Sequence, residues 1–144
     1  MNILISACLL GTACRYDGRS VPLPDSILTK LKNEYHLIPV CPEIFGGLPT
    51  PRLPSECSGK CVLRCDGADM TDAYLRGANE TLRLARFFDC RYAILKERSP
   101  SCGKGQIYDG TFTGTLTAGN GITASLLMEN GITVLGESEL SSLP

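Results

Sequence analysis

Residues 2–6 of the chain read NILIS, a short run with three consecutive aliphatic side chains and no polar residue between them. A strand with one face in water alternates apolar and polar side chains, so an unbroken apolar run indicates a strand that is covered on both faces. Such strands are typical of parallel sheets with helices on either side. The first run therefore predicts an α/β fold.

Three further apolar runs lie along the chain, and helical patterns separate them. The runs are Leu37–Val40, Tyr92–Leu95 and Ile132–Leu135, and the helical patterns are Pro24–Tyr35, Met70–Phe88 and Gly121–Glu129. The second helical pattern has the clearest apolar stripe. Alternation of strands and helices predicts a mainly parallel sheet whose strands are joined by right-handed crossovers.

Length and charge limit the class of protein. A chain of 144 residues predicts a single domain over residues 1–144. The net charge of −1 gives no electrostatic reason to expect a nucleic acid or an anionic membrane as a partner. The start of the chain has no basic region before its apolar run, so it does not read as a signal peptide. We expect a cytoplasmic protein and leave the oligomeric state open.

Two long segments, residues 42–69 and 99–119, do not fit the alternation of strands and helices. Both are rich in turn-forming residues. Long loops in compact domains commonly carry function. Each segment could also contain a small hairpin, around Lys60–Asp66 in the first and Thr111–Thr117 in the second.

Cysteines follow three of the predicted strands. The chain has 8 cysteines, and in a reducing compartment such a number points to metal binding or catalysis. Cys8, Cys41 and Cys102 come after the first, second and third strands, at the edge where parallel sheets bind ligands. Soft sulfur ligands select zinc, copper(I) or an iron–sulfur cluster. Three ligands leave one position open, which is typical of catalytic metal sites, and Cys14 could supply a fourth.

The remaining cysteines and the single histidine are weaker candidates for a metal site or a catalytic site. His36 lies at the far end of the second strand, which disfavours Ser-His and Cys-His mechanisms. Cys90 is expected to be a small buried hydrophobic residue. Cys57, Cys61 and Cys65 miss the common zinc and ferredoxin spacings. Simple thiols, a structural zinc ion and a reversible disulfide stay open for these three.

Polar residues beside the cysteines suit proton transfer. Glu43 is two residues past Cys41, where a carboxylate could act as a general base. The alternative is a salt bridge from Glu43 to Arg52 or Arg98. Ser101 could orient a water molecule or the substrate, or it could serve only as a turn residue.

Two basic residues follow the third strand. Lys96 and Arg98 could neutralise thiolates or bind an anionic substrate. The alternative is that they form ion pairs with Glu97 or Asp109. The sequence alone does not separate these two interpretations.

Several motifs together resemble one known family. They are SACLLG at residues 6–11, RYDG at 15–18, CPE at 41–43, KERSPSCG at 96–103 and IYDGTF at 107–112. The chain resembles the bacterial domain-of-unknown-function family that includes the iron–sulfur-dependent 2-thiouracil desulfidases. The resemblance covers nearly the whole chain, and the KERSPSCG motif is its most specific part. It implies a Rossmann-like three-layer sandwich with a sheet of about four to five strands.

The resemblance also implies a cofactor and a reaction. It implies a [4Fe-4S] cluster on Cys8, Cys41 and Cys102, with Glu43 and Ser101 as catalytic residues. The implied activity is that of a non-redox desulfidase, a C–S hydrolase that releases hydrogen sulfide from a thiolated pyrimidine such as thiouracil or a related small thiocarbonyl.

The sequence also suggests residues that contact the substrate and leaves open how many cysteines bind the metal centre. Arg98, Ser20 and Asp17 are expected to contact the substrate. Cys14 departs from the family pattern, where an apolar residue is usual, so a fourth ligand stays open. There are two alternative functions. One is a sulfur-transfer accessory protein that binds a metal or cluster. The other is a zinc or thiol-redox module without turnover.

Overall fold

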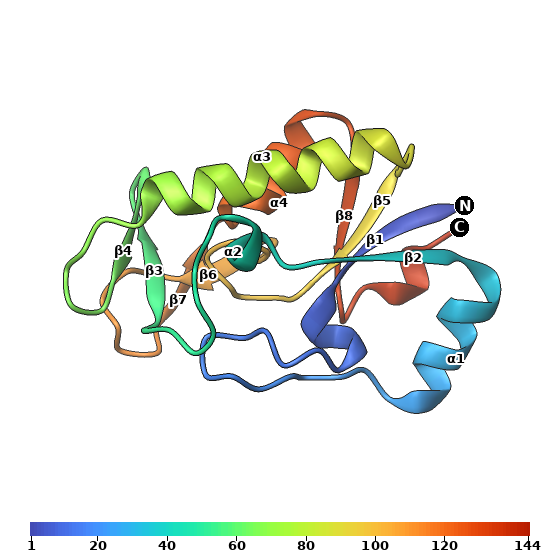
Figure 1. The fold of residues 1–144 in the computed structure, drawn as a ribbon, viewed down its shortest axis with the longest axis horizontal. Helices are drawn as coiled ribbons and strands as arrows, with labels where there is room; N and C mark the ends of the chain where they lie inside the picture. Colours follow the sequence, from blue (N-terminus) through green and yellow to red (C-terminus); the bar gives the residue numbers. More distant parts are fainter.

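The core of the protein is a four-stranded parallel sheet. A computed structural model describes all residues from 1 to 144. The strands of this sheet are β1 (Asn2–Ser6), β2 (His36–Val40), β5 (Tyr92–Leu95) and β8 (Thr133–Gly136). Their order across the sheet is β2-β1-β5-β8, and every neighbouring pair is parallel. The predicted α/β fold with a parallel sheet is confirmed (Figure 1).

The three predicted helices are present. They are α1 (Asp25–Glu34), α3 (Thr71–Phe87) and α4 (Ile122–Glu129). The short elements are η1 (Ala7–Leu10), α2 (Pro42–Phe45) and η2 (Leu140–Ser142). None of the helices is long and apolar enough to cross a lipid bilayer.

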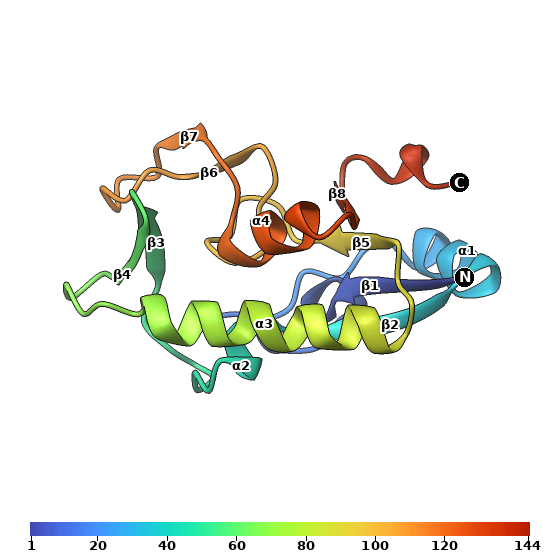
Figure 2. The same ribbon diagram turned by 90° about the horizontal axis from the view of Figure 1, so that it is seen from above.

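Helices cover both faces of the sheet. Along β1, Leu4 points into the core beneath α3 and α4, whereas Ile3 and Ile5 point into the core on the α1 side. Figure 2 shows α3 and α4 on the same side of the sheet, where they pack against each other. This separation follows from right-handed crossovers, because the chain moves outward from β1 to β2 and then in the opposite direction to β5 and β8. The strand order reverses between β1 and β5, which is where such sheets bind ligands.

Two antiparallel hairpins stand beyond the carboxyl edge of the sheet. One consists of β3 (Ser55–Ser58) and β4 (Cys61–Arg64), and the other of β6 (Gln106–Tyr108) and β7 (Leu116–Ala118). Both lie in the long segments predicted to hold hairpins, but the first strand of each begins earlier than predicted. Figure 1 shows the hairpins at the opposite end of the molecule from the two chain termini.

Helices α2 and α3 approach each other at two glycines. A Cβ atom on Gly77 would lie 1.8 Å from the carbonyl oxygen of Pro42, and one on Gly46 would lie 2.1 Å from that of Ala73. These distances are far below van der Waals contact, so no larger residue fits without moving a backbone. The close approach sets the position of α2, which carries Glu43.

We expect Gly77→Ala to lower the free energy of unfolding by about 1–3 kcal/mol, because the added methyl group overpacks the contact between α2 and α3. Urea denaturation measures the change. Asn79→Ala, at an exposed position of the same helix, is the matched control and should shift stability by no more than about 0.5 kcal/mol. Equal stability of the two variants would show that the glycine contact is not needed.

Candidate active site

The carboxyl ends of three neighbouring strands each bring a cysteine to one pocket. Cys8 lies in η1 directly after β1, Cys41 follows β2, and Cys102 lies in the loop after β5. All three line a pocket with a volume of about 490 Å³. Cys8 and Cys102 are buried, and Cys41 is half-buried. The structure thus brings together the three cysteines that the sequence placed at one edge of the sheet.

The loop that carries Cys102 is held on both sides by backbone hydrogen bonds. The Lys96 N–H donates to Ser6 Oγ at 2.9 Å, which ties the start of the loop to β1. The Cys102 N–H donates to Ser99 Oγ at 2.7 Å, and the Ser101 carbonyl accepts from two N–H groups in the first turn of α4. These bonds fix the direction of both the thiol and the serine hydroxyl.

The thiols lie close enough to affect one another's ionisation. Burial raises the pKa of Cys8 to about 12, and the neighbouring Cys102, Cys14 and Cys41 add to the shift. Burial also raises the pKa of Cys102 to about 11, although hydrogen bonds from two serines oppose the rise. Several thiolates in one buried place are therefore unfavourable without a positive centre between them. No three His, Cys, Asp or Glu side chains surround one point as the ligands of a single metal ion do.

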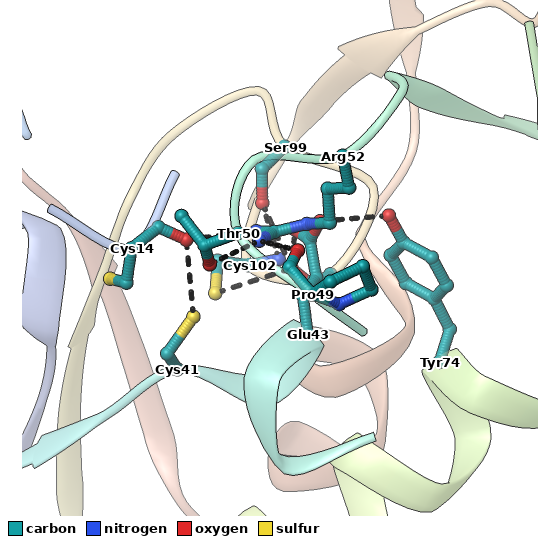
Figure 3. A network of polar contacts seen from close by, with 10 residues as sticks. Cys14, Cys41, Glu43, Pro49, Thr50, Arg52, Tyr74, Ser99 and Cys102 are labelled. Carbon is teal, nitrogen blue, oxygen red and sulfur yellow. Dashed lines mark hydrogen bonds and ion pairs between the residues drawn. The ribbon is translucent and has the colours of Figure 1, made fainter. Parts of the chain in front are cut away.

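A carboxylate with three hydrogen-bond donors lies beside the thiols. Arg52 Nε and the Tyr74 hydroxyl both donate to Glu43 Oε1, at 3.1 Å and 2.9 Å. Ser101 Oγ donates to the other oxygen, Glu43 Oε2, at 2.9 Å. Figure 3 shows Glu43 between Arg52 and Tyr74, with Cys102 nearby. The predicted salt bridge from Glu43 to Arg52 is present, and it coexists with the contact to Ser101.

Lys96 lies at the pocket and forms an ion pair with a residue that the sequence did not indicate. Lys96 Nζ is 2.5 Å from Glu137 Oε1. The Glu97 carboxylate accepts a hydrogen bond from the Ser138 N–H at 2.9 Å. A pair of Lys96 with Glu97, which the sequence left open as an alternative, does not form, because the segment after β8 supplies Glu137 for Lys96 and Ser138 for Glu97.

The three predicted substrate contacts lie in different places. Arg98 lines the pocket and adopts a left-handed backbone with φ of 72°. Asp17 and Ser20 do not line the pocket, and Asp17 accepts a backbone hydrogen bond within its own exposed turn. Their contact with a substrate stays a prediction.

Of the other cysteines, only Cys14 lies beside this cluster of three. Cys90 is buried in the core beneath α3 and α4, as predicted. Cys57 is buried in β3, while Cys61 and Cys65 are exposed on the same hairpin. Cys14 is buried and lines the pocket, and its carbonyl oxygen accepts a hydrogen bond from Arg52. A role for Cys14 as fourth ligand is open.

Sequence reasoning missed part of the pocket. Tyr74 lies within the predicted helix Met70–Phe88, and nothing in that pattern assigns it to the pocket. The available signal is that a buried tyrosine usually needs a partner for its hydroxyl group. Glu56, Tyr16 and Phe112 also line the pocket, and the two aromatic side chains are exposed. Tyr16 and Phe112 belong to the RYDG and IYDGTF motifs, and Glu56 belongs to none. No pattern assigns the three residues to the pocket, because the two hairpins and the loop after η1 bring them there.

The fold and the pocket define a class of protein. The parallel sheet is doubly wound, and the pocket at its point of strand reversal contains buried thiols, a carboxylate and a serine. These features are those of an α/β protein with a Rossmann-like site for a small ligand. The 2-thiouracil desulfurase family matches residues 3–139. The chain belongs to this family.

Two relatives match almost the whole chain. The uncharacterized protein YbbK of Bacillus subtilis (strain 168) is 40% identical over 151 residues, which is 98% of this chain and 99% of that protein. The solved structure of the [4Fe-4S]-dependent thiouracil desulfidase TudS is 46% identical and superposes with a TM-score of 0.95. That match covers 99% of this chain and 94% of the TudS chain.

Proposed function

We propose that this protein is a [4Fe-4S]-dependent, non-redox desulfidase that hydrolyses a thiolated pyrimidine such as thiouracil and releases hydrogen sulfide. The observation that carries the proposal is the meeting of three strand-end cysteines with a hydrogen-bonded Glu43–Ser101 pair in one pocket. The similarity to TudS and the family supports the same reaction.

The residues of the pocket fit an iron–sulfur cluster. Cys8, Cys41 and Cys102 would hold it, since soft thiolate donors select such clusters and all three line the same cavity. A cluster held by only three protein ligands would supply Lewis acidity to the carbon–sulfur bond of the substrate. The alternative cofactor is a single zinc ion, but no three side chains are arranged as the ligands of one metal ion.

Glu43 and Ser101 would carry out the proton transfer. Ser101 is buried and its hydroxyl lies 2.9 Å from Glu43 Oε2, so the two side chains can share and orient one water molecule. Glu43 takes a proton from that water, and the water oxygen bonds to the ring carbon that carried sulfur. Thiouracil and water thus give uracil and hydrogen sulfide without net electron transfer.

The pocket mouth supplies groups for substrate binding. Arg98 lines the pocket and can donate hydrogen bonds to the polar edge of a pyrimidine. Asp17 and Ser20 would reach the substrate only if their loop moves toward the pocket. The reaction would take place in the cytoplasm, where a reducing environment keeps ligand thiols available for a cluster.

The proposal is tested with anaerobically purified protein. We expect a brown protein with iron and labile sulfide in the ratio of a [4Fe-4S] cluster, and equal amounts of uracil and hydrogen sulfide from thiouracil. A colourless protein with stoichiometric zinc would instead support a zinc or thiol-redox module. Protein that holds a cluster but releases no sulfide from thiolated pyrimidines would support a sulfur-transfer accessory role.

A further inference from the structure

The two oxygens of the Glu43 carboxylate have different surroundings. Oε1 accepts hydrogen bonds from Arg52 Nε at 3.1 Å and from the Tyr74 hydroxyl at 2.9 Å. Oε2 accepts one hydrogen bond, from Ser101 Oγ at 2.9 Å. A carboxylate oxygen has two lone-pair directions, so both directions of Oε1 are occupied. Only Oε2 has room for another proton without loss of an existing bond.

Tyr74 is well placed to maintain this difference. It lies on α3 with 2% of its surface exposed, and its ring packs in a core cluster with Cys57, Val62 and Ile107. Burial and the nearby Glu43 carboxylate both raise the pKa of Tyr74, so its hydroxyl keeps its proton and acts as a donor. The packed ring therefore holds a permanent hydrogen-bond donor against Oε1.

Arg52 has a broader role than Tyr74. Its guanidinium group also donates to the carbonyl oxygens of Cys14 and Pro49 and to Thr50 Oγ1. Replacement of Arg52 would disturb the loop before β3 as well as the carboxylate. The Tyr74 hydroxyl can be removed while its packed ring stays, so the two contributions can be separated by experiment.

We propose that Tyr74 is a positioning residue that turns the Glu43 carboxylate so that Oε2 faces Ser101 and receives the proton during hydrolysis. This inference rests on the proposed function. In the step concerned, one O–H bond of water breaks and its proton passes to Oε2, while the water oxygen bonds to the ring carbon. The carbon–sulfur bond then breaks, the sulfur keeps the electron pair, and it leaves as hydrogen sulfide after protonation.

The test compares Tyr74→Phe with a matched control. Tyr35→Phe removes another buried tyrosine hydroxyl, one that donates to the Pro144 carbonyl away from the pocket. We expect Tyr74→Phe to lower kcat for sulfide release about 10- to 100-fold, the effect of losing a hydrogen bond to a charged group. The KM and the visible absorbance of the cluster should not change, and Tyr35→Phe should have wild-type kcat. An unchanged kcat in Tyr74→Phe would overturn the inference.

Crystal structures of the two variants give a readout that does not depend on turnover. In Tyr74→Phe we expect the Glu43 carboxylate to rotate and its hydrogen bond to Ser101 to be lost, whereas Tyr35→Phe should keep the wild-type orientation. An unmoved carboxylate in Tyr74→Phe overturns the positioning role even if sulfide release falls. Wild-type protein that releases no sulfide contradicts the proposed function, while the rotation still decides the role of Tyr74.

Discussion

Cys102→Ala is expected to lose the iron–sulfur cluster and all measurable sulfide release. Cys102 is one of three proposed ligands, and it lies in a loop fixed by the bond from its own N–H to Ser99 Oγ. Loss of an outer-shell partner alone costs about 10- to 100-fold in metal affinity, so loss of a ligand should cost more. Iron analysis, labile-sulfide analysis and visible absorbance of anaerobically purified protein measure the effect.

Cys90→Ala is the matched control for this ligand variant. Cys90 and Cys102 are both buried and belong to the same core cluster, so the two substitutions remove a sulfur atom from similar surroundings. Only Cys102 lines the pocket. Cys90→Ala should therefore keep its iron and its activity. Normal iron content in Cys102→Ala would rule out this residue as a ligand, and equal loss in both variants would indicate damage to the core instead.

The sequence predicted the central sheet well because β1, β5 and β8 are largely buried on both faces, while the edge strand β2 is partly exposed. The bounds of β1 and β5 agree with the predicted runs, β2 begins one residue earlier than predicted, and β8 is shifted by one residue at both ends. Burial on both faces leaves an unbroken apolar signal that needs no knowledge of neighbours. The hairpins were less accurately placed, since strands of three or four residues contain too few positions for a clear periodic pattern.

The meeting of the three cysteines could be predicted, because the topology of the sheet determines where they lie. Parallel strands share one carboxyl edge, so the positions of Cys8, Cys41 and Cys102 after three strands were enough to predict their meeting. The contact between Tyr74 and Glu43 joins residues 31 positions apart and depends on the packing of α2 against α3. No spacing rule connects a short helix after β2 with the middle of the chain, so this contact could be found only in the structure.

Glu43→Gln is expected to lower kcat about 10²- to 10⁴-fold while the cluster stays in place. Glutamine has nearly the same size as glutamate, so Tyr74 and Arg52 can still donate to its carbonyl oxygen. Its amide nitrogen then points toward Ser101, where it donates hydrogen bonds and has no lone pair for a proton from water. Sulfide release measured beside iron content separates loss of the base from loss of the cluster.

The control for the base variant removes a carboxylate that lies outside the pocket. Glu139 pairs with Lys104 and accepts the Gly136 N–H, and neither its side chain nor these partners line the cavity. Glu139→Gln should keep both iron and turnover. Turnover in Glu43→Gln close to that of Glu139→Gln would mean that another group takes the proton. In the proposed site the three cysteines would hold the cluster without Glu43, so a variant that loses iron and turnover together would instead make Glu43 part of the cluster site.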